Sequence, residues 1–416
     1  MRTINTINIM APAGSYEALM AAIKAGANSV YFGIEQLNMR ARSSNNFTLE
    51  DLKKIARICK ENKITAYLTV NTILYDHDLT LMKKIVDAAK EAKIDAIIAS
   101  DIAAIRYANS AGMPVHISTQ ANVCNIEAVK FFAKFADVIV LARELTLSQV
   151  KEICNEVKKQ DILGFSGKSL RIEIFAHGAL CVAVSGKCYM SLGVYNASAN
   201  RGACLQNCRR SYRVIDEETG DELVLDNKYV MSPKDLCTIK FLDKILGAGV
   251  SVLKIEGRGR GPEYVYTVTK AYREAADSVL EGTYTKERID SWMKQLGTVY
   301  NRGFWEGGYY LGKKLGEWSG SYGSKATKEK VYLGKVLNYY QKNNVGHFIL
   351  EAGTLKVGDE IIITGPTTGI VEMKAGSIFV DDKKVVCGKK GEEITIPIVE
   401  HIRPNDKLFV MVQRNA

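Results

Sequence analysis

Short apolar runs alternate with longer amphipathic stretches over the first 255 residues of the chain. The runs are rich in β-branched residues and predict eight strands, at Ile7–Ala11, Ser29–Gly33, Thr65–Val70, Ala96–Ala99, Val115–Ser118, Val138–Leu141, Ile172–Phe175 and Val250–Ile255. Between them, apolar residues recur at three- and four-residue steps, which predicts helices at Tyr16–Ala25, Leu49–Glu61, Leu79–Ala92 and Leu147–Lys158. Regular alternation of strand and helix implies a parallel sheet, and eight units imply an α/β fold closed into a TIM-like (β/α)8 barrel.

Polar or special residues directly follow most of these strands. They include Pro12–Ser15, Asn71 and Thr72, Ser100 and Asp101, Thr119–Asn122, Arg143 and Glu144, His177 and Gly178, and Gly257 and Arg258. In a (β/α)8 barrel such positions form the mouth at the carboxyl ends of the strands, where active sites lie. An open, doubly wound sheet would also bind ligands at its carboxyl edge, so the expected position of the site does not depend on closure.

A second pattern begins at about Lys328. Short alternating segments broken by Gly, Asn and Asp predict a small C-terminal antiparallel β-barrel, with strands near Tyr332–Leu337, His347–Leu350, Glu360–Ile363, Ile378–Val380, Glu393–Ile398 and Lys407–Val412. The Gly- and Ser-rich stretch Gly316–Ser324 suits a linker. We therefore predict a catalytic barrel over residues 1–320, with a cysteine-rich insertion at about residues 178–237, and a β-barrel over residues 328–416.

Composition narrows the class of protein. Apolar residues make up 47% and charged residues 25% of the 416 positions, as in ordinary globular proteins with a large core. The N-terminus lacks a signal-peptide core and no later stretch reaches 18 uninterrupted apolar residues, so we expect a cytoplasmic protein without a membrane span. The net charge of +10 favours a polyanionic partner such as RNA, although many cytosolic proteins are mildly basic without binding nucleic acid.

Five of the nine cysteines fall within 57 positions and follow the seventh predicted strand: Cys181, Cys188, Cys204, Cys208 and Cys237. The cytosol keeps thiols reduced, which favours metal binding or catalysis over disulfides. The polar, Gly-containing loop around these cysteines suits a [4Fe–4S] cluster, which needs four converging thiolates. Structural zinc and unligated buried cysteines remain alternatives. We expect the isolated Cys59 and Cys154 to be core residues on helices.

Other residues carry weaker signals. His177 follows a strand and is a candidate proton carrier, although a lone histidine is more often simply hydrogen-bonded in place. Glu256, Arg258 and Arg260 end the eighth strand, where barrel loops often bind anions; a solvated salt-bridge network is the alternative. The protease motifs HExxH and GxSxG are absent from the sequence.

The segment Glu173–Ser191, EIFAHGALCVAVSGKCYMS, resembles the signature of the peptidase U32 family throughout its length. Further blocks resemble the same family: Ala11–Gly14, Gly26–Ala27, Tyr31–Gly33, Arg201–Cys208, Met231–Leu236, Lys254–Arg258 and Asn301–Phe304. The resemblance covers essentially the whole chain.

The resemblance implies an oxygen-independent hydroxylase that uses a [4Fe–4S] cluster and takes its hydroxyl group from prephenate. Branches of the family hydroxylate the wobble uridine of tRNA at carbon 5, a cytidine of ribosomal RNA, or the ubiquinone ring as a paired complex. The short C-terminal β module is similar to the tRNA branch. The implied cluster ligands are Cys181, Cys188, Cys204 and Cys208; Cys208 is the least secure, and Cys237 is left out.

The favoured hypothesis is therefore a tRNA hydroxylase that forms 5-hydroxyuridine. Arginines bind carboxylates bidentately, so Arg143, Arg258 and Arg260 are the candidates for holding prephenate, with Arg40 and Arg42 in reserve. Glu173, His177 and Glu256 are the candidate catalytic residues. A collagenase-like protease, a hydroxylase of rRNA or a quinone precursor, and a non-enzymatic RNA-binding scaffold remain alternatives, and the need for a partner subunit is left open.

Overall fold

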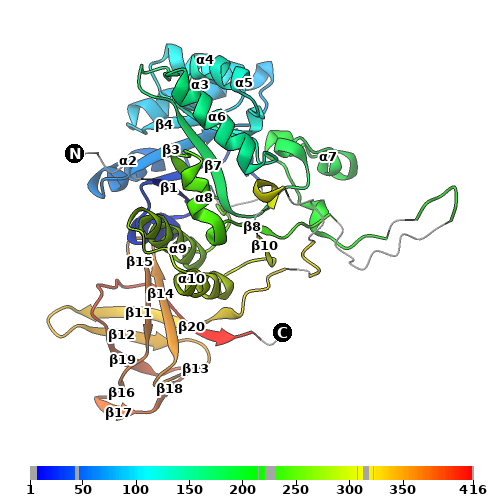
Figure 1. Ribbon diagram of the computed structural model, residues 1–416. Coiled ribbons are helices and arrows are strands. Elements are labelled where there is room, and N and C mark those ends of the chain that lie inside the picture. The colour runs from blue at the N-terminus through cyan, green and yellow to red at the C-terminus, as the bar shows by residue number, and fades with distance from the viewer. Residues whose placement is uncertain are drawn as a thin grey trace.

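The computed structural model describes residues 7–42, 46–213, 215–220, 231–306, 308–312, 318–321 and 323–414. Eight parallel strands in these residues form a barrel (Figure 1): β1 (Asn8–Pro12), β2 (Ser29–Phe32), β3 (Thr65–Val70), β4 (Ala96–Ala99), β5 (Val115–Ile117), β6 (Val138–Val140), β7 (Arg171–Gly178) and β9 (Val252–Ile255). Strand β9 pairs with both β1 and β7 and so closes the ring. The predicted TIM-like barrel is thereby confirmed.

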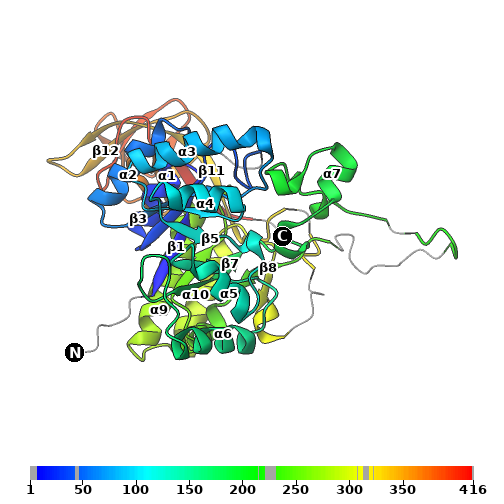
Figure 2. The same cartoon turned by 90° about the horizontal axis from the view of Figure 1, so that it is seen from above.

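Helices surround these strands (Figure 2): α1 (Tyr16–Lys24), α2 (Asp51–Glu61), α3 (Leu79–Glu91), α4 (Ile102–Ser110), α5 (Ile126–Ala133), α6 (Leu147–Lys159), α8 (Leu242–Gly247) and α9 (Pro262–Leu280). Local sequence sets where several of them begin. The side chains of Ser15, Asn125 and Thr146 accept hydrogen bonds from backbone N–H groups in the first turns of α1, α5 and α6. Since both faces of each strand are covered, most strand positions are apolar.

The sheet extends beyond the eight barrel strands. Strand β7 continues past the predicted end at Phe175 to Gly178, and β8 (Asp235–Cys237) pairs antiparallel with its last residues. Strand β10 (Phe304–Glu306) follows α10 (Lys286–Thr298) and pairs parallel with β8. Residues 179–213, here called the cysteine segment, leave the end of β7 and include the short helix α7 (Met190–Tyr195). Residues 214 and 221–230 of the predicted insertion lie outside the described residues.

The C-terminal region is antiparallel, as expected. Its larger sheet has the order β15-β14-β20-β11-β12-β19-β16-β17, and β13 pairs with β18. The bounds are β11 (Lys328–Tyr340), β12 (Val345–Leu350), β13 (Thr354–Lys356), β14 (Glu360–Gly365), β15 (Gly369–Lys374), β16 (Ile378–Val380), β17 (Lys383–Val385), β18 (Cys387–Lys389), β19 (Glu393–Pro397) and β20 (Lys407–Gln413). Of the predicted linker, residues 316, 317 and 322 lie outside the described part of the chain.

The C-terminal sheet packs against the barrel through β14 and β15. Ala21 of α1 is buried together with Ile362 and Ile370. Lys24 forms an ion pair with Glu400 at 2.6 Å across the same boundary. Figure 1 shows this sheet beneath α9 and α10, away from the cysteine segment. No helix in the described ranges has the length and apolar character needed to cross a bilayer.

Candidate functional site

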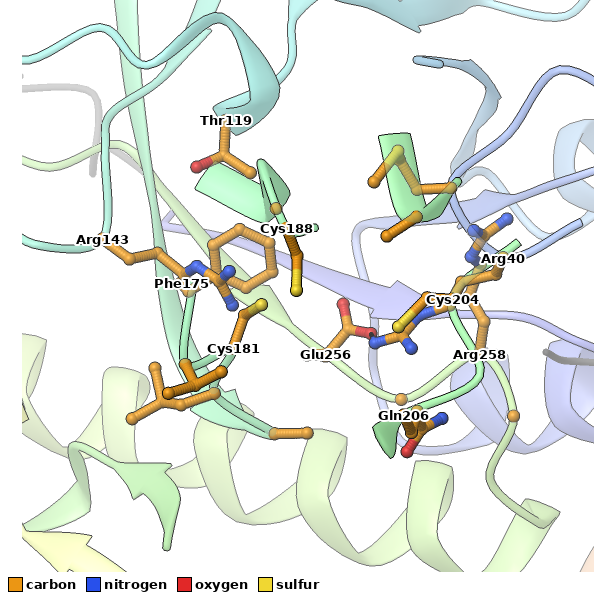
Figure 3. A pocket seen from close by; sticks show the side chains of 18 of the residues that line it. Arg40, Thr119, Arg143, Phe175, Cys181, Cys188, Cys204, Gln206, Glu256 and Arg258 are labelled. Carbon is orange, nitrogen blue, oxygen red and sulfur yellow. Dashed lines mark hydrogen bonds and ion pairs between the residues drawn. The ribbon is translucent and has the colours of Figure 1, made fainter. Parts of the chain in front are cut away.

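A cavity of about 420 Å³ opens at the carboxyl ends of the barrel strands (Figure 3). Its walls come from two sources. Strand ends and the loops after them contribute residues such as Thr69, Arg143 and Glu256, and the cysteine segment contributes the other wall. The cavity therefore lies where the sequence predicted the site, at the mouth of the barrel.

All four predicted cluster ligands, Cys181, Cys188, Cys204 and Cys208, line this cavity. Figure 3 shows the first three pointing into the same space. Burial raises the pKa of the Cys208 thiol; the charge of Arg209 opposes that rise, and the three other thiols of the segment add to it.

Two glycines let the cysteine segment lie close against the barrel loops. Gly186 and Gly202 both have positive φ angles, of 73° and 83°. A Cβ atom at Gly202 would stand 2.3 Å from the carbonyl oxygen of Asn38, and one at Gly186 would stand 2.7 Å from Oε1 of Gln120. Larger residues would push the segment, and the cysteines it carries, away from the strand ends.

The fifth cysteine has a different environment. Cys237 is buried outside the cavity, where its thiol donates to the sulfur of Met293 at 3.7 Å. Burial raises the pKa of Cys237 to about 12, so it stays a protonated thiol at neutral pH.

The chemistry of the donor set fits an iron–sulfur cluster, because four soft thiols from one segment face one cavity. In the ranges the structure describes, no group of three or more His, Cys, Asp or Glu side chains has the spacing to hold a single metal ion. A cube of four irons holds its four thiolates farther apart than one ion does.

The cavity wall is strongly cationic. Among the described residues, only two acidic ones line it, Asp235 and Glu256. Seven cationic residues of the same part of the chain line it: Arg40, Arg143, Arg209, Lys254, Arg258, Arg260 and Arg302. Ion pairs neutralise three of them, Arg40 with Glu256 at 2.9 Å, Arg302 with Asp235 at 3.4 Å, and Lys254 with Glu173 at 2.9 Å. The other four arginines make no ion pair within the described residues, which favours an anionic ligand.

Arg258 is held as a preformed cation. Its Nη1 donates to Oγ1 of Thr69 at 3.1 Å and its Nη2 to Oδ1 of Asn38 at 2.9 Å. Burial lowers the pKa of Arg258 to about 10, and the residue still carries its charge at neutral pH. The space it occupies depends on Gly33, where a Cβ atom would stand 2.2 Å from Nη1 of Arg258.

The two other arginines predicted to bind the donor lie on aromatic rings. The Arg143 guanidinium stands 5.3 Å from the ring centre of Phe175, and that of Arg260 stands 3.4 Å from the ring centre of Tyr300. Stacking on a ring orients a guanidinium and leaves its N–H groups available at the edges.

Glu256 is a carboxylate rather than an acid at neutral pH. Burial acts to raise its pKa, but the charges of Arg40, Arg258 and Arg143 outweigh burial and hold the pKa below its usual value. The hydroxyl of Tyr31 also donates to Oε2 of Glu256 at 3.2 Å.

Glu173 and His177, two of the three predicted catalytic residues, do not line the cavity. Glu173 is fully buried deeper in the barrel, where Oε1 accepts from Nζ of Lys254. His177 is buried between the rings of Tyr264, Tyr272 and Phe304, with Nδ1 3.3 Å from the Tyr272 hydroxyl. Burial lowers the pKa of His177 to about 3, so its imidazole is neutral at pH 7.

Three cationic wall residues were not predicted as site residues from the sequence: Lys254, Arg209 and Arg302. Lys254 lines the cavity from within an otherwise apolar strand. A lysine at such a position needs a carboxylate partner, so the sequence pattern could have indicated that Lys254 belongs to a charged site. Arg209 directly follows Cys208, and its guanidinium donates to the carbonyl oxygen of Pro233 at 2.9 Å. Nothing in the sequence near Arg209 indicated that contact.

Comparisons with known proteins agree with the resemblance. The sequence model described as Peptidase family U32 matches residues 14–320. A Porphyromonas gingivalis protein named collagenase is 57% identical over 98% of both chains. A Bacillus subtilis protein named tRNA hydroxylation protein P1 is 30% identical over 86% of this chain and 83% of its own. A solved structure of a U32 peptidase is 12% identical and covers 61% of this chain and 94% of its own with a TM-score of 0.38, a likeness too low to support an argument.

Proposed function

Because this chain belongs to peptidase family U32, we propose that it is an oxygen-independent tRNA hydroxylase that forms 5-hydroxyuridine at the wobble position. One observation carries the proposal: four cysteines and four arginines without ion-pair partners in the described residues line the same cavity. That combination suits a thiolate-bound redox cluster beside an anionic co-substrate. The similarity to a protein named for tRNA hydroxylation supports the choice of RNA.

The arginines are suited to a dicarboxylate donor such as prephenate. Arg258 would bind one carboxylate from the cavity wall, since its guanidinium is already fixed by Thr69 and Asn38. Arg143 and Arg260 are oriented by their stacked rings and are the candidates for the second carboxylate. Glu256, already paired with Arg40, would help to position these cations rather than supply a proton.

Cys181, Cys188, Cys204 and Cys208 would hold the [4Fe–4S] cluster. When bound, a cluster of this kind would supply electron-transfer chemistry next to the donor. The target uridine would reach the cavity from an unpaired loop, because a loop base can be splayed out without opening a duplex. We expect the enzyme to act in the cytoplasm.

Nucleoside mass spectrometry tests the proposal. tRNA and rRNA are purified separately from cells with and without this protein and digested to nucleosides. Loss of 5-hydroxyuridine from the tRNA fraction alone is the expected result. Loss of a hydroxylated cytidine from the rRNA fraction would move the substrate to ribosomal RNA. Unchanged nucleosides in both fractions would overturn an RNA hydroxylase.

A collagenase-like protease is the second candidate, because the 57% identical relative carries that name. The described cavity gives little support to a protease, because none of the residues lining it is a histidine that could activate a nucleophile. The full-length protein, purified anaerobically, should therefore leave denatured collagen intact under conditions in which it hydroxylates tRNA. Cleavage that disappears in a Cys181→Ala variant would favour the protease instead, since it would place proteolysis at this cavity.

A further inference from the structure

Exposed apolar side chains are concentrated in the cysteine segment. Of the 22 large hydrophobic side chains that are exposed in the described structure, six lie between residues 184 and 205: Val184, Tyr189, Leu192, Val194, Tyr195 and Leu205. A cluster of this kind on one surface element usually marks a binding surface. Figures 1 and 2 show that α7, which carries three of the six, projects from the side of the barrel.

The ring of Tyr189 offers a flat, exposed surface. Its ring lies against Gly193, one helical turn ahead: a Cβ atom at Gly193 would stand 2.8 Å from Cε1 of Tyr189. The ring thus packs close to the glycine on one side, and Tyr189 remains 75% exposed. An aromatic ring held on one side and open on the other is prepared for stacking.

Tyr195, at the end of the same helix, carries a cation on its ring. The guanidinium carbon of Arg210 stands 5.2 Å from the ring centre of Tyr195, and Arg210 Nη1 donates to the Tyr195 hydroxyl. The pair places an aromatic face and a planar cation together on an exposed surface.

The charge of the segment is one-sided. Between Gly178 and Arg213 the sequence contains five cationic residues and no Asp or Glu: Lys187, Arg201, Arg209, Arg210 and Arg213. Apolar surface combined with an excess of cations suits a partner that offers both flat rings and negative charge. Unpaired RNA has this chemistry, since its bases stack on aromatic and guanidinium planes while its phosphates bind cations.

We propose that Tyr189 and the Tyr195–Arg210 pair form a stacking platform for the unpaired bases that flank the modified nucleotide. The platform adjoins the cavity, because Cys188 and Met190, on either side of Tyr189, both line it. Bases stacked outside would hold the loop open while one base enters the cavity. This inference rests on the proposed function for its substrate and adds the surface that recognises the loop.

RNA binding by the full-length, cluster-containing protein tests the platform. The probe is a synthetic hairpin with a seven-nucleotide unpaired loop, compared with the same sequence closed into a duplex. Wild-type protein should prefer the hairpin. Tyr189→Ala should weaken hairpin binding by about 5- to 150-fold, the effect of losing one stacked base, with no change in the salt dependence of binding. Arg210→Ala should weaken binding and also flatten the slope of log affinity against log salt by about one.

Matched variants distinguish the loss of stacking from other causes of weaker RNA binding. Phe165→Ala, which removes an exposed aromatic ring from the loop before β7, should bind like wild type. Tyr189→Phe should retain binding because it keeps the ring, whereas Tyr189→Leu should lose it although the surface stays apolar. Gly193→Ala should also weaken binding, since its methyl group displaces the ring without changing any charge. All variants should keep the iron content and melting temperature of the wild type.

Two results would overturn the platform. The first is that the wild-type protein binds the hairpin and Tyr189→Ala binds it with the same affinity. The second is a Tyr189→Leu variant that retains full binding, which would indicate a general apolar contact of the kind a protein or lipid partner makes. Neither result contradicts the proposed function, because that function is tested separately by the nucleosides found in cells. Unchanged cellular nucleosides would remove the proposed function while this binding assay still decides whether the surface stacks RNA.

Discussion

Arg40 donates a hydrogen bond of 2.9 Å to the carboxylate of Glu256, although the two residues are 216 positions apart in the chain. Sequence alone left open an ion pair between Glu256 and its near neighbour Arg258. Arg258 is instead fixed by two neutral partners, Asn38 and Thr69. The carboxylate of Glu256 is thus neutralised by Arg40, from the loop after β2. The positive charge of Arg258 therefore remains available for an anionic ligand.

The first prediction concerns Arg258. Arg258→Ala should lower kcat/KM for prephenate by about 10- to 150-fold, the effect of losing a charge-assisted hydrogen-bonded contact. Arg258→Lys should also be impaired, because an ammonium cannot reproduce the planar fork that reaches both Thr69 and Asn38. The measurement is 5-hydroxyuridine formed per tRNA at varied prephenate.

Two further variants control this test. Gly33→Ala should reproduce the defect without removing a charge, because its methyl group would displace the Arg258 guanidinium. Arg57→Ala removes an exposed arginine elsewhere and should be fully active. Normal activity of both Arg258 variants would contradict the binding of prephenate by Arg258. Arg143 and Arg260 would then be the remaining candidates for that role.

The second prediction concerns the cluster. Anaerobically purified protein should contain about four irons and four sulfides per chain. Cys181→Ala and Cys188→Ala should lose this iron, whereas Cys237→Ala should keep most of it, since Cys237 is buried outside the cavity against Met293. Iron and labile sulfide are measured together with the visible absorption spectrum. Stoichiometric zinc without sulfide, or equal loss of iron in Cys237→Ala, would contradict the ligand assignment.

The barrel could be predicted from the sequence because its strands are largely buried on both faces and leave short runs rich in apolar, β-branched residues. The three-residue strands β8 and β10 could not, because pairing to the end of β7 rather than local pattern defines them. The placement of His177 shows a similar limit. Strict alternation would put it on the same face as Phe175, but the pairing of β7 with β9 shifts register between Phe175 and His177. The imidazole consequently packs against α9 instead of the cavity.

The third prediction is a pH dependence of stability that arises from His177. Its folded pKa of about 3 lies below the value of about 6.5 expected in the unfolded chain. The unfolded state therefore binds more protons below pH 6.5, and stability should fall as pH drops from 6.5 towards 3 and be unaffected above pH 7. One such group contributes a slope of up to about 1.4 kcal/mol per pH unit.

Urea unfolding of His177→Gln at pH 7, 6 and 5 measures that contribution. The variant should lose less stability on acidification than the wild type, whatever its stability at pH 7. The buried His116, whose pKa is also lowered by burial, should still contribute a loss of the same sign. His77→Gln, at an exposed position, is the matched control. Identical slopes for His177→Gln and wild type would show that folding does not lower the pKa of His177.

The last prediction concerns the C-terminal region, whose similarity to the tRNA branch of the family suggests a role in docking tRNA. Deleting this region would uncover the apolar surface of α1 that contains Ala21, so loss of binding after deletion would be ambiguous. Gly369 offers a finer test. Its φ is +70°, and a Cβ atom there would stand 2.8 Å from Cβ of Met20 and 3.0 Å from the backbone nitrogen of Ala21.

Gly369→Val should therefore push the C-terminal sheet away from α1. Gly358→Val is the matched control: its φ is +93°, but a Cβ atom there meets nothing within 4 Å, so it carries the backbone strain without the clash. We expect Gly369→Val to be less stable than the control by about 1–3 kcal/mol, the usual cost of overpacking. If the sheet docks tRNA in a fixed position relative to the barrel, Gly369→Val should also bind tRNA more weakly than the control while keeping its iron. Equal tRNA affinity of the two variants, despite the difference in stability, would show that the sheet stabilises the barrel and takes no part in docking.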